Sequence, residues 1–304
     1  MTTLGFVGLG HMGEPMAARL AQHDSGLVVW NRTIAKVGRL AALGAAPAAS
    51  AAEVFDRCDV VVLMLANGTV IDEILGRQGH DFSVSLGGRV VVNMGTVAPE
   101  YSLRLYEDVL SRGGRYVEAP VSGSRVPAEA GQLVAMLAGD AAVVRMVEPL
   151  LAPMTAATFH CGQVPMALET KLAVNTFLIS MVTGLAEAVS FAEHRGLDLT
   201  TLRAVLDAGP MSSAVSRIKL AKLVSGDLSA QASVSDVLYN NRLILAAAPT
   251  TDCMPLLAQC AELYAEAEAL GLGSADMAAV IEAIRGRKDT RLAPTVPAFP
   301  VSQS

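Results

Sequence analysis

A lysine and an asparagine on one apolar stretch, Lys171 and Asn175, have the residue types and the spacing for acid–base chemistry. Positions four apart lie on the same face of a helix, so both side chains can reach one point. The neighbours of Lys171 are apolar, and burial there lowers the pKa of an ammonium group towards neutrality, which suits a general acid or base. On residue type alone, a lysine that reaches solvent or pairs with Glu169 or Glu187 is the more common arrangement.

The N-terminal segment carries a pattern typical of a phosphate-binding loop. A Gly-x-Gly-x-x-Gly sequence follows the strand predicted at 4–7 and opens the helix predicted at 12–23. The first glycine permits the tight turn, the second lets the backbone approach a pyrophosphate, and the third lets the helix close on the strand. The free N–H groups of the helix start then face the phosphates. We therefore expect the cofactor to contact Gly8, Leu9, Gly10, His11, Met12 and Gly13.

The residues after the second strand, predicted at 27–30, indicate which dinucleotide binds. An NAD site carries an acid at this turn, whereas this chain has Asn31-Arg32-Thr33. Arg32 can pair with a 2′-phosphate, and Asn31 and Thr33 can add neutral hydrogen bonds. We therefore predict NADP(H) as the cofactor. Met64 and Leu65 end the strand predicted at 60–65 and are expected to contact it too, because open α/β sheets bind ligands at that edge.

Apolar β-type runs alternate with helical stretches in the first half of the chain, which favours α/β architecture with a Rossmann-type, doubly wound parallel sheet. After Gly162 the pattern is all-α, beginning with an unbroken helix of about 45 Å from Pro165 to His194. We predict a Rossmann domain over 1–163, a helical domain over 164–287 that starts with this interdomain helix, and a flexible tail over 288–304. The other strands are expected at 90–92, 116–117, 132–137 and 157–159, and the other helices at 34–43, 70–75, 99–112, 141–150, 200–208, 213–224, 235–248, 255–270 and 274–285.

Composition limits the classes of function. Hydrophobic residues make up 52% of the 304 residues and charged residues 17%, which excludes disorder over most of the chain. A net charge of −6 with no long basic run argues against a nucleic-acid partner. The four cysteines and five histidines lack metal-ligand spacing, so we expect no metal.

The long predicted helix bears on location and assembly. Its apolar stretch at 172–189 contains or adjoins charged residues, and the chain start has no basic, cleavable leader. We therefore expect a cytoplasmic protein that does not span a membrane. The helix also carries more apolar surface than one partner domain covers, which favours a homodimer or larger homo-oligomer. That surface is predicted at Leu178, Met181, Val182, Leu185 and Val189.

Several motifs occur in a characteristic order. The opening stretch at 5–16 reads Gly-Phe-Val-Gly-Leu-Gly-His-Met-Gly-Glu-Pro-Met, and the stretches Asn-Met-Gly-Thr-Val-Ala-Pro at 93–99 and Glu-Ala-Pro-Val-Ser-Gly-Ser at 118–124 follow it. The most specific piece is Gly162-Gln163 followed by Lys171 and Asn175. In these motifs, over nearly its whole length, the chain resembles the β-hydroxyacid dehydrogenase family, which includes hydroxyisobutyrate dehydrogenases and glyoxylate or succinic-semialdehyde reductases.

The resemblance implies an NADPH-dependent reductase or dehydrogenase that transfers a hydride between the nicotinamide and a small aldehyde, keto acid or hydroxy acid. It implies that Lys171 is the proton donor or acceptor and that Asn175 is a substrate ligand. It also implies that Thr96 lies near the nicotinamide, where it contacts cofactor and substrate. The substrate segment assigned by the resemblance comprises Ser122, Gly123 and Ser124.

The chain departs from the family pattern on the helix predicted at 235–248. Family members carry a Lys-Asp pair on a helix of the second domain, and we assign the equivalent position to Ser235-Asp236, with Tyr239 nearby. We place these three residues at the substrate site, although Ser235 also fits neutral drift and Tyr239 also fits helix packing. Arg125 could supply the missing positive charge. The departure keeps an imine reductase open, and a biosynthetic reductase for a larger substrate is a further alternative. Because a fold alone does not decide function, a non-catalytic NADPH-binding module is the alternative of another class, against which the Lys171–Asn175 pair argues.

Overall fold

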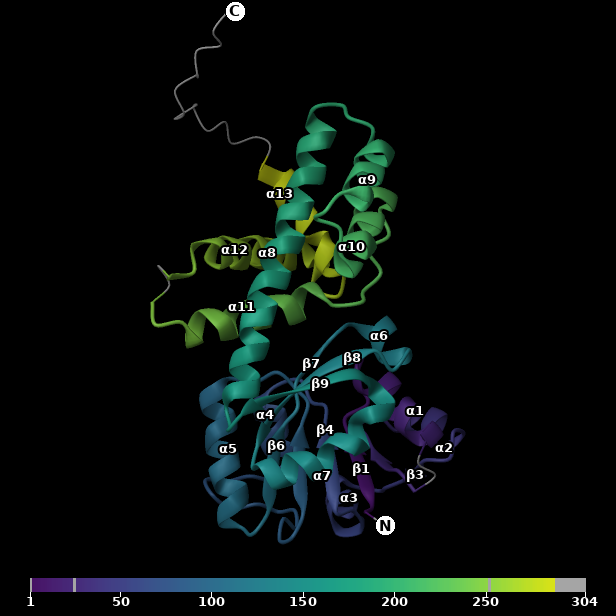
Figure 1. Ribbon diagram of the computed structural model, residues 1–304, viewed down its shortest axis with the longest axis vertical. Coiled ribbons are helices and arrows are strands. Elements are labelled where there is room, and N and C mark those ends of the chain that lie inside the picture. Colours follow the sequence, from purple (N-terminus) through teal and green to yellow (C-terminus); the bar gives the residue numbers. More distant parts are fainter. Residues whose placement is uncertain (1, 24–25, 251–252, 288–304) are drawn as a thin grey trace, which may run out of the picture. The chain divides into compact units, whose positions relative to one another are not determined.

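The computed structural model describes residues 2–23, 26–250 and 253–287, and Figure 1 shows its elements. The described residues form two compact units. The first comprises those up to Leu178 and those from Tyr239 to Pro255, and the second those from Ile179 to Leu238 and from Leu256 onward. The domain boundary at 163/164 stays a prediction, and the tail predicted at 288–304 lies outside the described residues.

A sheet built mainly of parallel strands forms the centre of the first unit. The strand order β3-β2-β1-β4-β5-β6 is parallel throughout, and the winding direction reverses between β1 and β4. Open α/β sheets bind ligands at such a reversal, beyond the carboxyl ends of the strands. The predicted Rossmann-type sheet is confirmed. Its strands are β1 (Leu4–Val7), β2 (Val28–Trp30), β3 (Ala46–Pro47), β4 (Val60–Leu63), β5 (Val90–Asn93), β6 (Arg115–Glu118), β7 (Val121–Ser122), β8 (Leu133–Gly139) and β9 (Thr155–Gly162).

Strand β8 runs against its neighbours β6 and β7, while β9 is parallel to it. One antiparallel register continues from Val117↔Gly139 to Ser122↔Val134, and the N–H of Met136 donates to the carbonyl of Pro120 within it (3.0 Å). Strands β6 and β7 therefore behave as one interrupted strand. The link from β7 to β8 holds only the short helix α6 (Arg125–Glu129), which is less than the crossover that a parallel pair needs.

Helices cover both faces of the sheet, as strands that are apolar on both sides require. Successive residues of β1 show this, because Phe6 and Val7 belong to two different hydrophobic clusters. One cluster contains side chains of α1 (Gly13–His23), α2 (Ile34–Ala41) and α7 (Ala141–Leu151), and the other those of α3 (Ala51–Arg57), α4 (Gly68–Leu75) and α5 (Pro99–Ser111). Helices α3 and α6 and strands β3 and β7 were not predicted, because each is too short to show a periodicity.

The remaining helices confirm the all-α pattern after Gly162. They are α8 (Met166–His194), α9 (Leu199–Ala208), α10 (Ala214–Ser225), α11 (Val234–Ala247), α12 (Pro255–Ala267) and α13 (Val280–Gly286), with the turns η3 (Glu268–Leu272) and η4 (Met277–Ala279). The turn η1 (Ala152–Met154) lies earlier, between α7 and β9. The helix predicted at 274–285 begins later than expected. The side chain of Asp276 caps the N–H of Ala278, so the helical run starts at Met277.

Helix α8 has the length and composition of a membrane-spanning helix. Its most apolar 18-residue window has a mean hydropathy of 1.6, and 39% of that window is buried. Core helices of soluble proteins pass the same test. The feature by itself therefore does not indicate a membrane protein.

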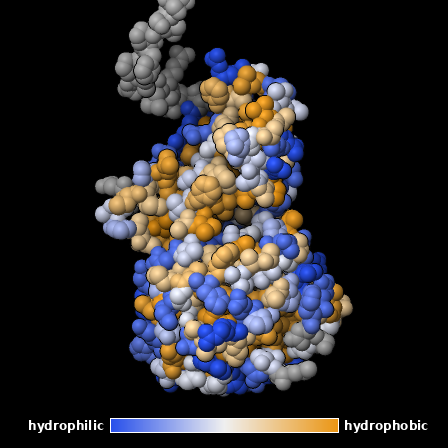
Figure 2. All heavy atoms as spheres, in the orientation of Figure 1, coloured by the Kyte–Doolittle hydropathy of each residue, from blue (hydrophilic) through white to orange (hydrophobic). Residues whose placement is uncertain are grey.

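The apolar surface of α8 differs in part from the predicted one. The exposed aromatic side chains of this helix are Phe177 (72%) and Phe191 (64%). In the second unit, Figure 2 shows hydrophobic residues in orange gathered over α8 and α12. The five residues predicted to form the exposed surface are fully or half buried, since the helix packs that side inward: Leu178, Met181, Val182, Leu185 and Val189.

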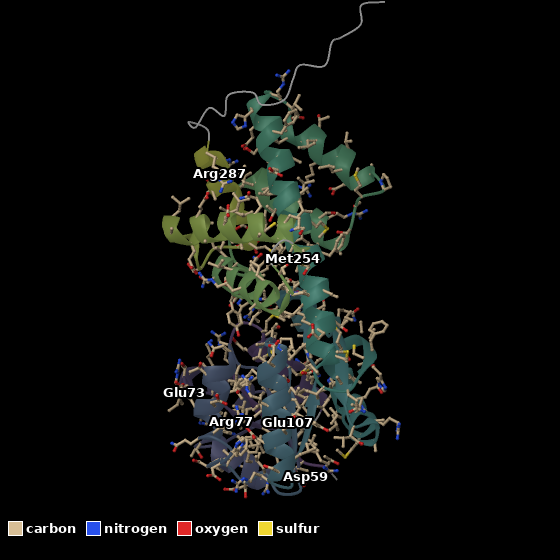
Figure 3. The ribbon with its side chains drawn as sticks, turned by 90° about the vertical axis from the view of Figure 1, so that its left-hand side faces the viewer. Asp59, Glu73, Arg77, Glu107, Met254 and Arg287 are labelled. Carbon is tan, nitrogen blue, oxygen red and sulfur yellow. The ribbon has the colours of Figure 1, made fainter. Side chains whose placement is uncertain are left out.

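A polar network fixes the segment between α4 and β5. Arg77, labelled in Figure 3, donates to Asp72 (3.0 Å) and to the buried Asp108. Asp108 also contacts Nδ1 of His80 (2.5 Å), and the hydroxyl of Tyr101 donates to Asp72 (2.7 Å). Because both carboxylates already have cationic partners, this network is a structural support.

Candidate active site

The predicted acid–base lysine is buried and has no polar partner among the described residues. Lys171 and Asn175 lie on α8 with 7% and 5% of their surface exposed. Within the residues that the structure describes, no hydrogen bond or ion pair reaches Lys171, so pairing with Glu169 or Glu187 is excluded there. Burial lowers the pKa of Lys171 to about 8. An ammonium group with this pKa can give or take a proton near neutral pH.

Asn175 is held by a residue that was not among the predicted site residues. Its Nδ2 donates to Oδ1 of Asn240 on α11 (2.9 Å). Its own Oδ1 is buried, and no hydrogen-bond donor reaches it from the residues that the structure describes. A buried polar atom left in this state points to a missing ligand or water. No sequence signal links two residues 65 positions apart on different helices, and only the fold brings them together.

The glycine loop between β1 and α1 has the form of a phosphate cradle. Gly8 has φ +101°, and a side chain at Gly13 would meet the carbonyl oxygen of Gly8 at 1.9 Å, so the turn itself requires both glycines. A Cβ at Gly10 would meet nothing within 4 Å. Internal packing therefore does not explain Gly10, whereas a pyrophosphate lying on the loop would. These residues fit a dinucleotide. Around them, Leu9 is buried, Met12 is half-buried and His11 is exposed.

The three predicted cofactor residues in the turn after β2 differ in their contacts: one supports the glycine loop, and the other two are exposed. Asn31 braces the loop, since its Oδ1 accepts from the N–H of Leu9 (2.8 Å) and its Nδ2 donates to the carbonyl of Thr33 (3.1 Å). Arg32 is exposed and has no partner among the described residues. Thr33 is exposed and precedes α2 without capping it through its side chain. Arg32 is thus the side chain at this turn that is free to meet an anion.

The other predicted residues of the first unit follow the carboxyl ends of its strands. Met64 and Leu65 come directly after β4 and are half-buried, and Thr96 lies three residues after β5. The substrate segment lies at β7 and the start of α6, with Ser122 and Ser124 half-buried and Gly123 exposed. Because β4, β5 and β6 are neighbours in the sheet, these segments leave the same edge.

Arg125 does not present a free positive charge. Its Nε donates to Glu129 (2.8 Å) and its Nη1 to the carbonyl of His11 (3.3 Å), with Glu14 at 4.0 Å. Two carboxylates therefore already surround the guanidinium, which weakens it as the replacement for a missing substrate-binding lysine.

Three predicted residues of α11 fall in different surroundings. Ser235 donates to Glu268 (2.6 Å), and Asp236 accepts from the hydroxyl of Ser233 (2.7 Å) at the start of the helix. Both are exposed and belong to the second unit. Tyr239 is half-buried and belongs to the first unit, as do Lys171, Asn175 and Asn240. Burial raises the pKa of Tyr239.

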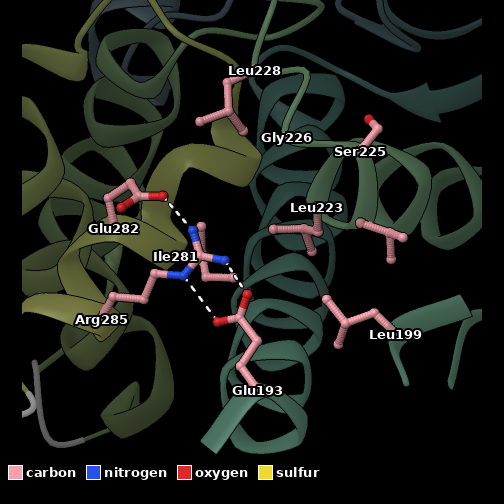
Figure 4. A pocket seen from close by; sticks show the side chains of 10 residues that line it. Glu193, Leu199, Leu223, Ser225, Gly226, Leu228, Ile281, Glu282 and Arg285 are labelled. Atoms are coloured by element: carbon pink, nitrogen blue, oxygen red, sulfur yellow. Dashed lines mark hydrogen bonds and ion pairs between the residues drawn. The ribbon is translucent and has the colours of Figure 1, made fainter. Parts of the chain in front are cut away.

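A separate pocket of about 280 Å³ lies in the second unit (Figure 4). Arg285 reaches into it and is paired with Glu193 and Glu282, and the rest of the lining is mainly aliphatic. Since its charges are already neutralised within the pocket, it does not resemble an acid–base site. Among the described residues, no three His, Cys, Asp or Glu side chains are grouped to hold a metal.

Comparison with known proteins assigns the family. The NAD binding domain of 6-phosphogluconate dehydrogenase matches residues 3–162, and the NAD-binding domain of NADP-dependent 3-hydroxyisobutyrate dehydrogenase matches residues 167–284. The chain belongs to the β-hydroxyacid dehydrogenase family. It is therefore an NAD(P)-dependent oxidoreductase that uses a nicotinamide cofactor. The resemblance inferred from the motifs is confirmed.

Individual relatives extend over almost the whole of this dehydrogenase-family chain. Glyoxylate/succinic semialdehyde reductase 1 of Arabidopsis thaliana is 34% identical over 93% of the chain and 98% of the relative. The 2-(hydroxymethyl)glutarate dehydrogenase of Eubacterium barkeri is 28% identical over 92% and 93%. The solved structure of Mycobacterium tuberculosis 3-hydroxyisobutyrate dehydrogenase with L-serine is 26% identical, covers 94% of this chain and 99% of its own, and has a TM-score of 0.81.

Proposed function

We propose that this β-hydroxyacid dehydrogenase is an NADPH-dependent reductase of small aldehydes or keto acids, with the corresponding alcohols or hydroxy acids as products. The observation that carries the proposal is the buried Lys171, which has no hydrogen-bond or ion-pair partner in the part of the chain that the structure describes. It lies on the same helix face as Asn175, in the unit that also holds the phosphate cradle. The names of the relatives, which include a glyoxylate and succinic semialdehyde reductase, support this class of substrate.

The chemistry that a bound NADPH supplies is transfer of a hydride to the carbonyl carbon. Lys171 in its ammonium form then protonates the developing alkoxide oxygen, and in the reverse direction the neutral amine removes that proton. The substrate is oriented by Asn175, Thr96, Ser122, Ser124 and the N–H of Gly123. Asn240 fixes the Asn175 amide so that its Oδ1 stays available to a ligand donor.

The test of this function is NADPH oxidation with glyoxylate, succinic semialdehyde and a cyclic imine in parallel. We expect turnover of the two small carbonyl acids and little with the imine, because Lys171 is suited to protonating an alkoxide. Turnover of the imine alone would replace the proposal by imine reduction. Tight NADPH binding without consumption of any substrate would indicate a non-catalytic module.

The preference for NADPH over NADH should depend on Arg32. We expect Arg32→Ala to weaken NADPH binding about 10- to 100-fold, the loss typical of one charge-assisted pair, and to leave NADH binding unchanged. Titrating both cofactors by fluorescence measures this. Arg39→Ala is the matched control, since Arg39 lies on α2, is 76% exposed and is already paired with Glu14. Equal weakening of both cofactors in Arg32→Ala would refute a role in 2′-phosphate recognition.

The proposal also includes a cytoplasmic location and a homodimer or larger homo-oligomer. Exposed Phe177 and Phe191 now support the assembly, in place of the residues first expected. A monomeric mass in light scattering would contradict it.

A further inference from the structure

The first turn of α8 is capped by a carboxylate from the sheet. Glu118, the last residue of β6, has no exposed surface. Its Oε2 accepts hydrogen bonds from the N–H groups of Ala167 (3.2 Å) and Leu168 (3.3 Å). These are the second and third residues of α8, whose amides have no partner within the helix. A negative charge at this position also interacts favourably with the helix dipole.

Glu118 is close in sequence to one part of the site and contacts the helix that carries the other. It lies four residues before Ser122 in the substrate segment. On the helix side, Leu168 lies three residues before Lys171, which is less than one turn. Strand β6 is paired on both sides at this position, since Glu118 is in register with Asn93 on β5 and with Ala138 on β8. A single side chain therefore joins a rigid strand to the start of the catalytic helix.

We propose that Glu118 is a positioning residue that holds the first turn of α8, and with it Lys171, in place relative to the substrate segment. The proposal rests on the proposed role of Lys171. This positioning role requires a hydrogen-bond acceptor at position 118. It involves no contact between Glu118 and substrate or cofactor.

The surroundings of Glu118 make this support sensitive to pH. Burial raises its pKa to about 7, while Ser102 and the two helix N–H groups lower it. The titratable groups that face it are Glu169 of α8, which raises the pKa further, and Tyr116 of its own strand. The neighbouring residues of β5, α5 and β8 are Asn93, Ser102 and Ala138, none of which titrates.

The sign of the effect follows from that pKa. Above about pH 7 the carboxylate is ionised and is the stronger acceptor for the two helix amides. As the pH falls through 7 it becomes protonated and the bonds weaken. Its Oε1 is buried without a hydrogen-bond partner in the part of the chain that the structure describes.

The experiment compares Glu118→Gln and Glu118→Leu with the control Glu148→Gln. Glu148 lies on α7, and its carboxylate accepts hydrogen bonds from Thr158 and His160. In Glu118→Leu we expect the amides of 167–171 to exchange with deuterium about tenfold faster, and kcat to fall about tenfold or more with NADPH affinity within about twofold. In Glu118→Gln, which keeps an acceptor but cannot ionise, kcat should lose its dependence on a group of pKa about 7. The control should match the wild type in deuterium exchange, kcat, NADPH affinity and pH profile.

Unchanged exchange at 167–171 in Glu118→Leu would overturn the proposal, as would an unchanged kcat and pH profile in both Glu118 variants. A loss of NADPH affinity in parallel with kcat would also reject it, because a general structural defect explains that pattern. The exchange measurement needs no substrate. If the wild type fails to reduce any carbonyl, the proposed function falls while the exchange still decides whether Glu118 holds the helix.

Discussion

Replacing Lys171 with methionine should lower kcat about 10³-fold and leave NADPH affinity within about twofold, the effect expected for loss of a general acid. Methionine fills a similar volume without a charge, and Lys171 has no ion pair or hydrogen bond to lose among the described residues. Removing a buried charge should therefore not destabilise the fold. Steady-state kinetics, NADPH titration and thermal unfolding measure the three quantities.

The pH profile provides a second measure of the same residue. Because burial lowers the pKa of Lys171 to about 8, the rate of carbonyl reduction should fall as the pH rises through 8, where the ammonium form is lost. The rate of alcohol oxidation should fall as the pH drops through 8, where the neutral amine is lost. Arg104→Met, which removes an exposed cation from α5, is the control and should behave as the wild type. Normal turnover in Lys171→Met would end the assignment.

Replacing Asp276 with alanine should destabilise the second unit by about 3–5 kcal/mol, the usual effect of leaving a buried charge without its partner. Both carboxylate oxygens of Asp276 contact Nζ of Lys219 (2.8 and 2.9 Å), and the two side chains are 0% and 5% exposed. Asp276 also accepts from the N–H groups of Gln231 (2.9 Å) and Ala278 (3.1 Å). Its loss therefore leaves an ammonium group and two amides without acceptors. Urea unfolding followed by circular dichroism measures the change.

The control for that substitution is Asp227→Ala. Asp227 faces Lys222 at 3.5 Å but is 63% exposed, so solvent screens the pair and the expected loss of stability is far smaller than for Asp276→Ala. If both variants lose the same stability, burial of the ion pair is not the cause. Burial lowers the pKa of Lys219 even though Asp276 opposes this, which agrees with a strongly desolvated pair.

The sequence alone was sufficient to predict the features that depend only on residues close together in the chain. The loop from Gly8 to Gly13 could be predicted, because a tight turn and a close backbone approach restrict a few adjacent positions to glycine. The extent of α8 followed from a segment between Pro165 and His194 that contains no helix breaker apart from the isolated Gly184. The common face of Lys171 and Asn175 followed from helical periodicity alone.

Tertiary structure decided the contacts between distant segments. The partner of Asn175 is Asn240, the cap of α8 is Glu118, and the acceptor for Lys219 is Asp276, each at least 49 positions away in the chain. The direction of β8 depends likewise on a short connection through α6. The polar character of these side chains is visible in the sequence, but their partners are not. Burying a polar group is favourable only when a partner is supplied, and the packing of the folded chain determines which residue supplies it.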